Sequence, residues 1–277
     1  MRTFTLVNGN GEEYSITSKE SFFHDPKGLG YGRSNTYRQI GNRWVLVKTL
    51  PTQNSITGSL LLLGASPYDQ YNQFLEFCGG ESLVLKYQTT NIIYSRDVIL
   101  SKVEKTEIDK DWHGLDLDLT FTCMSLWTRT LTTTNKQSVQ KVFWPIVWPI
   151  TWGQNSPMSM TVQSTSHQNS PSLLTINGPF SDPSWRHYVN DVLYETGAVH
   201  CTIPEGAMLL VDNRFGDESM KVVTTDGTLI QDVYPLSDFS TKRFINIQYG
   251  ANTIIVQSAS ANFVTVKLEV KITYESV

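Results

Sequence analysis

Two stretches of this chain alternate strictly between apolar and polar residues, and that pattern constrains the fold more than any other feature. A period of two with one polar face is typical of antiparallel β-sheet and is incompatible with a helix. The first stretch lies at residues 115–122 and the second at 264–274. Their apolar members are Leu115, Leu117, Leu119 and Phe121 in the first stretch, and Val264, Val266, Leu268, Val270, Ile272 and Tyr274 in the second. We therefore predict a mainly β protein.

One segment departs from this pattern. In SPYDQYNQFLEFCGG, Ser66 is a suitable N-cap, Pro67 suits the first helical position, and Asp69 favours the first turn. Apolar residues recur at helical spacing as far as Cys78, and Gly79 can end the helix. Short β-rich runs flanked by turn residues fill most of the remaining chain, including RWVLVKTL, SLVLKY, AMLLVD and NTIIVQS.

The composition changes near residue 140. From Val142 to Ser181 the chain has no Asp, Glu, Lys or Arg, and it opens there with FWPIVWPITWG. We predict an N-terminal domain over 1–142 and a C-terminal domain over 143–277, with 143–153 as an extended connector. Three exposed indoles would form an apolar patch that proteins seldom leave uncovered, so we expect them at a domain or subunit contact. They are Trp144, Trp148 and Trp152.

The chemistry-bearing residues do not indicate an enzyme. The three cysteines, at 78, 123 and 201, form no paired motif, and none of the five histidines has metal-ligand spacing. No catalytic residue, metal or cofactor is therefore predicted. Of the three classes of function that we consider for this chain, a hydrolase is the least favoured. With 22 basic and 26 acidic residues, the net charge of −4 gives no global field for nucleic acid. The eleven-residue Trp/Pro stretch is too short to span a membrane, so we expect a soluble chain made in the cytoplasm.

A carbohydrate-binding module is the main alternative. Exposed aromatic rings stack on sugars, and DPSWRHY places Trp185 and Tyr188 where they would serve this purpose.

The order of several short segments resembles the distal tail proteins of long-tailed phages that infect Gram-positive bacteria. These segments are FTLVNGNGEEYSI, GLGYGRSNTYRQIGNRWV, SRDVILSKVEKTEI, FTCMSLWTR, the Trp/Pro connector, and FINIQYGANTIIVQS. The similarity extends over nearly the whole chain, and the length leaves no room for large carbohydrate-binding insertions.

The resemblance implies a β-barrel-like N-terminal domain with one helix and a C-terminal galectin-like β-sandwich. It also implies a homohexameric ring at the virion tail tip, synthesised in the host cytoplasm. Such a hub joins the tail tube protein to tail-associated and receptor-binding or baseplate proteins. DNA would pass through its lumen without specific binding, which an acidic chain would favour.

Overall fold

The computed structural model describes residues 2–79, 82–108, 113–136, 158–214, 218–257, 260–261 and 265–277. Its strands and single α-helix fall into two compact units, 1–129 with 274–277 (unit 1) and 130–273 (unit 2). The chain leaves unit 1 within β10 and returns to it within β23. The predicted boundary between Val142 and Phe143, together with the Trp/Pro connector, lies outside the described residues. No helix in the described ranges has both the length and the apolar character needed to cross a membrane.

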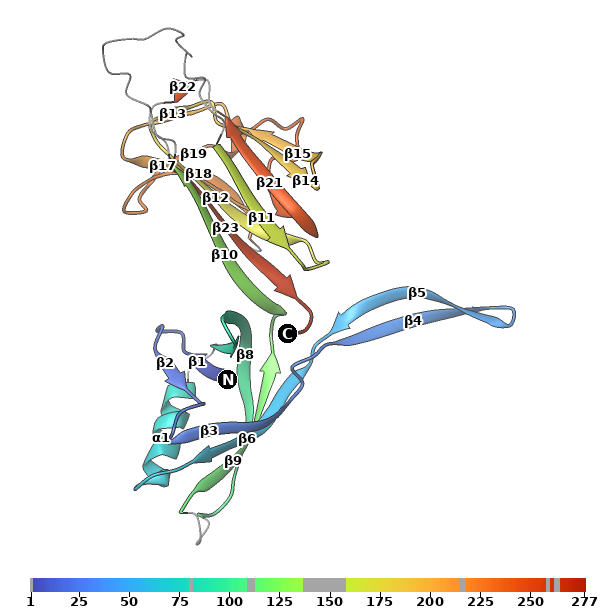
Figure 1. The fold of residues 1–277 in the computed structure, drawn as a ribbon, viewed down its shortest axis with the longest axis vertical. Coiled ribbons are helices and arrows are strands. Elements are labelled where there is room, and N and C mark those ends of the chain that lie inside the picture. Colours follow the sequence, from blue (N-terminus) through green and yellow to red (C-terminus); the bar gives the residue numbers. More distant parts are fainter. Residues whose placement is uncertain are drawn as a thin grey trace. The chain divides into compact units, whose positions relative to one another are not determined.

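Unit 1 is a curved sheet with a helix on one face (Figure 1). Its strands run in the order β2-β1-β7-β8-β9-β6-β3, and every neighbouring pair is antiparallel. The bounds are β1 Thr3–Val7, β2 Glu13–Ser15, β3 Ser21–Lys27, β4 Gly32–Ile40, β5 Arg43–Thr52, β6 Ser55–Leu62, α1 Pro67–Cys78, β7 Leu83–Thr89, β8 Ile92–Lys105, β9 Leu115–Cys123 and β10 Trp127–Lys136. The described strands do not close into a barrel, because no ladder joins β2 to β3 and only an isolated bridge links Thr17, just after β2, to Phe22 of β3. The barrel-like part of the expected fold is therefore corrected to an open sheet.

The predicted helix and the alternating strand both form. In β9, the apolar positions are buried and the intervening polar positions are more exposed, as period two requires. In α1, Phe74 and Cys78 enter the core, and Tyr14 of β2 packs against Phe74 with ring centroids 5.6 Å apart. The cap differs from expectation in one respect: the Ser66 hydroxyl bonds to the Asp69 carboxylate, and no side-chain cap bond reaches the helix backbone.

Unit 2 contains two main antiparallel sheets. One has the order β19-β18-β17-β12-β23-β10 and the other β11-β21-β14-β15 (Figure 1). The bounds are β11 Met158–Ser164, β12 Ser170–Asn177, β13 Phe180–Ser181, β14 Ser184–Val189, β15 Val192–Ala198, β16 Thr202–Ile203, β17 Ala207–Asp212, β18 Ser219–Thr224, β19 Leu229–Asp232, the 3-10 turn η1 Tyr234–Leu236, β20 Asn246–Ile247, β21 Gly250–Gln257, β22 Ser260–Ala261 and β23 Thr265–Tyr274. Alternate residues of β11, β21 and β23 are buried, as in a two-sheet sandwich. The mainly β prediction with one α-helix is confirmed.

Candidate functional site

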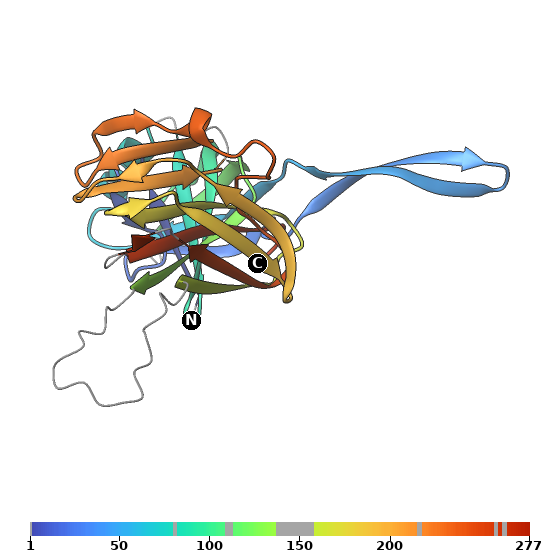
Figure 2. The same cartoon turned by 90° about the horizontal axis from the view of Figure 1, so that it is seen from above.

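The β4–β5 hairpin is the part of unit 1 that has no intramolecular cover. Figures 1 and 2 show it extending away from β3 and β6, the strands that flank it in the chain. Its ladder runs from Gly32 opposite Thr52 to Ile40 opposite Arg43, with one irregularity at Thr36 and Tyr37. At about 3.3 Å per residue, a nine-residue strand projects about 30 Å. The hairpin is therefore long enough to reach well beyond the sheet that carries it.

Both faces of the hairpin are exposed. Every residue from Arg33 to Thr52 is exposed, and Trp44 retains 68% of its surface. The other large apolar side chains exposed on it are Tyr37, Ile40, Val45, Leu46, Val47 and Leu50. An isolated two-stranded hairpin is marginally stable in water, and so many exposed apolar side chains on one hairpin usually mark an interaction site. The hairpin is therefore the leading candidate for a contact with another protein chain.

Charge is segregated in the same hairpin. Residues 32–52 contain three arginines and one lysine and no acidic residue, whereas the other 256 residues hold 18 basic and 26 acidic residues. The hairpin thus has a net charge of +4 and the remainder −8. Opposite potentials on the two parts of one chain favour contact between copies of that chain.

The base of the hairpin is held firmly by unit 1. The Arg33 guanidinium forms a bidentate ion pair with Glu275, with N–O distances of 2.6 to 3.2 Å. The Asn54 amide donates to the carbonyls of Gly28 and Gly30, each at 3.0 Å. Gly28 has a φ of +83°, and a Cβ there would lie 2.0 Å from the Ser55 carbonyl oxygen. These contacts fix the direction of the hairpin before any partner binds, which lowers the cost of ordering it.

Behind this base lies a buried polar group. The Arg96 guanidinium donates to the Ser125 carbonyl and to the Asn54 side-chain oxygen, both at 2.6 Å. Its carbon lies 5.5 Å from the Trp127 ring centroid, and the Trp127 indole donates to the Leu29 carbonyl at 3.2 Å. Burial lowers the pKa of Arg96. The same residues that form the core of unit 1 thus orient the segment from which the hairpin departs.

The aromatic residues predicted as contacts lie elsewhere. Trp144, Trp148 and Trp152 are outside the described residues. Trp185, a sugar-stacking candidate, is only 1% exposed, so its ring is not available to a saccharide. Tyr188 is half-buried and retains some exposed surface. Sequence reasoning missed the hairpin because it treated RWVLVKTL only as one of several short β-rich runs flanked by turn residues. The signal that marks it is the absence of any acidic residue from Pro26 to Tyr68, combined with the run Trp44 to Val47.

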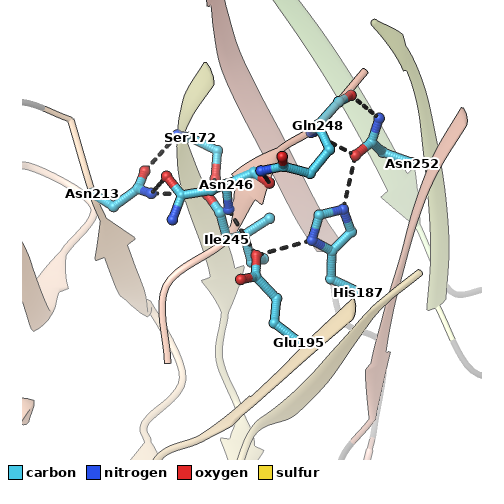
Figure 3. A network of polar contacts seen from close by, with 8 residues as sticks. All are labelled: Ser172, His187, Glu195, Asn213, Ile245, Asn246, Gln248 and Asn252. Atoms are coloured by element: carbon cyan, nitrogen blue, oxygen red, sulfur yellow. Dashed lines mark hydrogen bonds and ion pairs between the residues drawn. The ribbon is translucent and has the colours of Figure 1, made fainter. Parts of the chain in front are cut away.

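The strand that carries Trp185 also carries a closed polar network (Figure 3). His187 is fully buried, and its ring nitrogens contact Glu195 Oε1 and Asn252 Oδ1, each at 2.9 Å. The same Glu195 oxygen accepts from the Asn246 backbone N–H at 2.8 Å. The Asn252 amide donates to the Gln248 and Gly250 carbonyls at 2.8 and 2.9 Å. Each of these buried groups has its partners inside unit 2, which indicates a structural role.

The three cysteines are also buried and are not arranged as a reactive site. All three cysteines are free and buried. Burial raises the pKa of the Cys78 thiol to about 12, and burial together with the Asp182 charge raises that of Cys201 to about 11. Burial also raises the pKa of Cys123. Such thiols are protonated at neutral pH and are poor nucleophiles. In the described part of the chain, no cluster of three or more His, Cys, Asp or Glu side chains could hold a metal ion.

Comparison with known proteins gives a consistent picture. Residues 3–124 match the model of the distal tail protein N-terminal domain. The chain is similar over its whole length to a chain of the phage P2 baseplate in its activated conformation with calcium, with 17% identity, a TM-score of 0.65 and full coverage of both chains. It is also similar to the SPP1 Dit protein, described as a paradigm of the hub adsorption apparatus in phages that infect Gram-positive bacteria. In that case the identity is 11% and the TM-score 0.63, with 98% of this chain and 99% of the other covered. At these identities the structural likeness concerns the fold. No curated protein matches the chain.

Proposed function

Since residues 3–124 form a distal tail protein N-terminal domain, in a chain that has the Dit fold from end to end, we propose that this protein is a structural component of a phage tail tip. Distal tail proteins are structural hub proteins and are not known as enzymes. The observation that carries the proposal is that the matched domain itself bears the uncovered hairpin. A protein that works by assembly needs such a surface, whereas a monomeric enzyme does not.

The proposed assembly is a homohexameric ring built through the N-terminal domain. Head-to-tail contacts between identical subunits close into rings when the rotation between them permits it. The tail tube protein would bind one side of this hub, and tail-associated and receptor-binding or baseplate proteins would bind the other. DNA would pass through the lumen without specific binding, and the acidic balance outside the hairpin agrees with such a passage. The finished protein would reside in the virion tail tip after synthesis in the host cytoplasm.

The division of labour within the chain is also part of the proposal. The N-terminal domain, 1–142, forms the ring, and a galectin-like C-terminal domain, 143–277, presents further partners. We assign Trp144, Trp148 and Trp152 to the contact between domains or subunits. Trp148→Ala is expected to weaken folding or assembly, since loss of a packed tryptophan costs about 3 to 5 kcal/mol. Normal assembly of this variant with loss of binding to cell-wall glycans would favour a carbohydrate module instead.

The mass of the full chain in solution tests the central proposal. Six copies of the 31.3 kDa chain have a mass of about 188 kDa. Mass photometry and light scattering across a range of concentrations are expected to detect this species. A chain that stays monomeric at every concentration would overturn the proposed ring.

A further inference from the structure

Arg243 lies in a loop of unit 2 with its guanidinium packed against two aromatic rings. The central guanidinium carbon is 4.4 Å from the Phe239 ring centroid and 5.2 Å from the Tyr234 ring centroid. A third ring, that of Phe244, stacks on Tyr234 with centroids 6.3 Å apart. Aromatic faces at such distances attract a guanidinium through cation–π contacts. The rings therefore hold the charged group in place without supplying it with a hydrogen-bond acceptor.

The hydrogen-bond donors of Arg243 are not satisfied. Its Nε and Nη1 atoms are buried, and neither has an acceptor among the described residues. In the same part of the chain, the arginines that form ion pairs are Arg33, which pairs with Glu275, and Arg214, which pairs with Asp212. Buried donors without an acceptor cost free energy, and native structures usually supply a protein group, a water or an ion. Arg243 thus has the donors of an anion site and no internal anion.

Arg96 of unit 1 shows how a buried arginine is held when its role is structural. It also has one buried nitrogen, Nη1, without an acceptor. Its other nitrogens, however, donate to the Ser125 carbonyl and to the Asn54 side-chain oxygen, both at 2.6 Å. These bonds orient the segment at the base of the hairpin. The Arg243 guanidinium has no such bond to the described residues, so the fold of unit 2 alone does not explain its presence.

The backbone at Arg243 is strained. Its φ is +65°, in the left-handed region that is uncommon for residues other than glycine. The Phe244 N–H donates to the Lys242 carbonyl at 2.7 Å, which makes Arg243 the central residue of a γ-turn with positive φ, a rare and strained type. The Arg243 N–H donates to the Thr196 carbonyl of β15 at 3.2 Å and so anchors this turn to the sheet. Strain of this kind is found at ligand clamps, where the surrounding structure maintains it.

The surroundings of Arg243 suit an anion that arrives from solvent. Lys242 is exposed and places a second cation on the same turn. The Asp238 carboxylate, which precedes this turn, accepts from the Ser240 N–H and hydroxyl at 2.9 and 2.7 Å and does not pair with Arg243. Phe239, which covers the guanidinium, is 60% exposed. A small ligand therefore reaches the guanidinium by displacing a ring that already lies at the surface.

We propose that Arg243 is the centre of an oxyanion-binding site in unit 2, which takes a phosphate or carboxylate group. A guanidinium presents its N–H groups in one plane, and both kinds of anion accept two of them at once. The ligand supplies the acceptors that Nε and Nη1 lack. The flanking rings exclude water, which strengthens the interaction between the charges. The site is built entirely from residues of unit 2 and does not depend on the proposed ring.

Thermal unfolding of the full chain in phosphate, acetate or chloride tests the proposal. Ionic strength and protein concentration are held constant, and chloride is the reference for general salt effects. A ligand that binds only the folded state stabilises it, so we expect phosphate or acetate to raise the melting temperature as its concentration increases. Isothermal titration calorimetry then measures the dissociation constant of each anion. A parent chain that binds neither phosphate nor acetate overturns the proposal.

Substitutions at Arg243 are needed because phosphate also stabilises proteins without binding to a site. Arg243→Gln removes the charge, and Arg243→Gly is expected to fold because glycine adopts a φ of +65° without strain. Each is expected to bind the anion at least about tenfold more weakly than the parent, through loss of charge-assisted hydrogen bonds. Arg243→Lys keeps the charge but lacks the planar pair of donors, and it is also expected to bind more weakly.

Arg186→Gln is the matched control, since it removes the same charge from an exposed position of β14 in the same unit. We expect it to bind the anion as the parent does. Circular dichroism checks that all variants fold. Equal binding by the parent and Arg243→Gln overturns the proposal. Equal weakening in Arg186→Gln and Arg243→Gln also overturns it, because the response would then follow net charge and not a site at Arg243.

Discussion

The β4–β5 hairpin of unit 1 and the β14–β15 hairpin of unit 2 follow the same local rules but differ in what covers them. Each has a two-residue connection that begins in the left-handed region, at Gly41 with φ +60° and at Asn190 with φ +48°. Each strand pair carries a tryptophan, Trp44 or Trp185. Trp44 is 68% exposed, whereas Trp185 is only 1% exposed because it is buried in the core of unit 2. The comparison shows that turn chemistry makes a hairpin, while the surrounding layers decide whether it serves stability or binding.

The largest expected effect comes from removing the uncovered hairpin. Replacing residues 32–52 with a short Gly/Ser turn is expected to abolish the oligomer, because it deletes the proposed contact and leaves the sheet order of unit 1 unchanged. Light scattering measures the mass, and far-ultraviolet circular dichroism checks the fold. An oligomer of unchanged size would show that the β4–β5 hairpin is dispensable for assembly.

The two tryptophans give the most direct comparison. Trp185→Ala is expected to lower the free energy of unfolding by about 3 to 5 kcal/mol, since it leaves a cavity in a packed core. Trp44→Ala is expected to change it by less than about 0.5 kcal/mol while weakening assembly. Urea unfolding and mass photometry measure the two quantities.

Trp185→Phe is the matched control for the buried position. It retains most of the ring volume and removes an indole N–H that has no hydrogen-bond acceptor among the described residues. It is therefore expected to cost less than Trp185→Ala. Equal unfolding effects of Trp44→Ala and Trp185→Ala would contradict the contrast between the hairpins.

The third test asks how much the buried polar network around His187 of β14 contributes to the stability of unit 2. His187→Ala leaves the buried Glu195 and Asn252 side chains without a shared partner, and we expect a loss of about 3 kcal/mol in unfolding free energy. The neighbouring exposed Arg186 supplies the control, since Arg186→Ala is expected to be nearly neutral. Chemical denaturation checks both variants. If His187→Ala unfolds like its parent, the network does not support the sandwich.

The smallest effect at neutral pH concerns the thiols. Because the folded-state pKa of Cys78 is raised to about 12, the native state keeps the thiol proton that the unfolded chain loses near its ordinary value of 9.0. The resulting stability is fully present below about pH 9 and is lost as pH rises toward 12. Urea unfolding between pH 8 and 11 is expected to show this decline, and Cys78→Ala is expected to reduce it. Rapid reaction of Cys78 with a thiol reagent at pH 8 in the folded protein would contradict the assignment.

Much of the fold was predictable because its signals are local. Alternation depends only on neighbouring residues facing opposite sides of a strand, and residues 115–122 and 265–274 of the two alternating stretches form strands. The helix signals at Pro67 and Gly79 act over a single turn, and α1 ends at Cys78 as predicted. The open sheet of unit 1 was not predictable in this way, because the curvature of the whole sheet decides whether β2 and β3 form a ladder or only the isolated bridge between Thr17 and Phe22.

The candidate site was predictable only in part. The resemblance named the family whose N-terminal domain model matches residues 3–124, and those residues include the hairpin. The sequence did not distinguish Trp44 from Trp185, since both lie in aromatic, strand-forming segments.

By itself, therefore, the sequence determined the element types, the segregation of basic residues into 32–52, and the absence of paired cysteine motifs. Only the tertiary structure decided that Trp185 is covered and that Trp44 is uncovered. The physical reason is that alternation and charge are properties of adjacent residues, whereas burial depends on which distant segments pack over a strand.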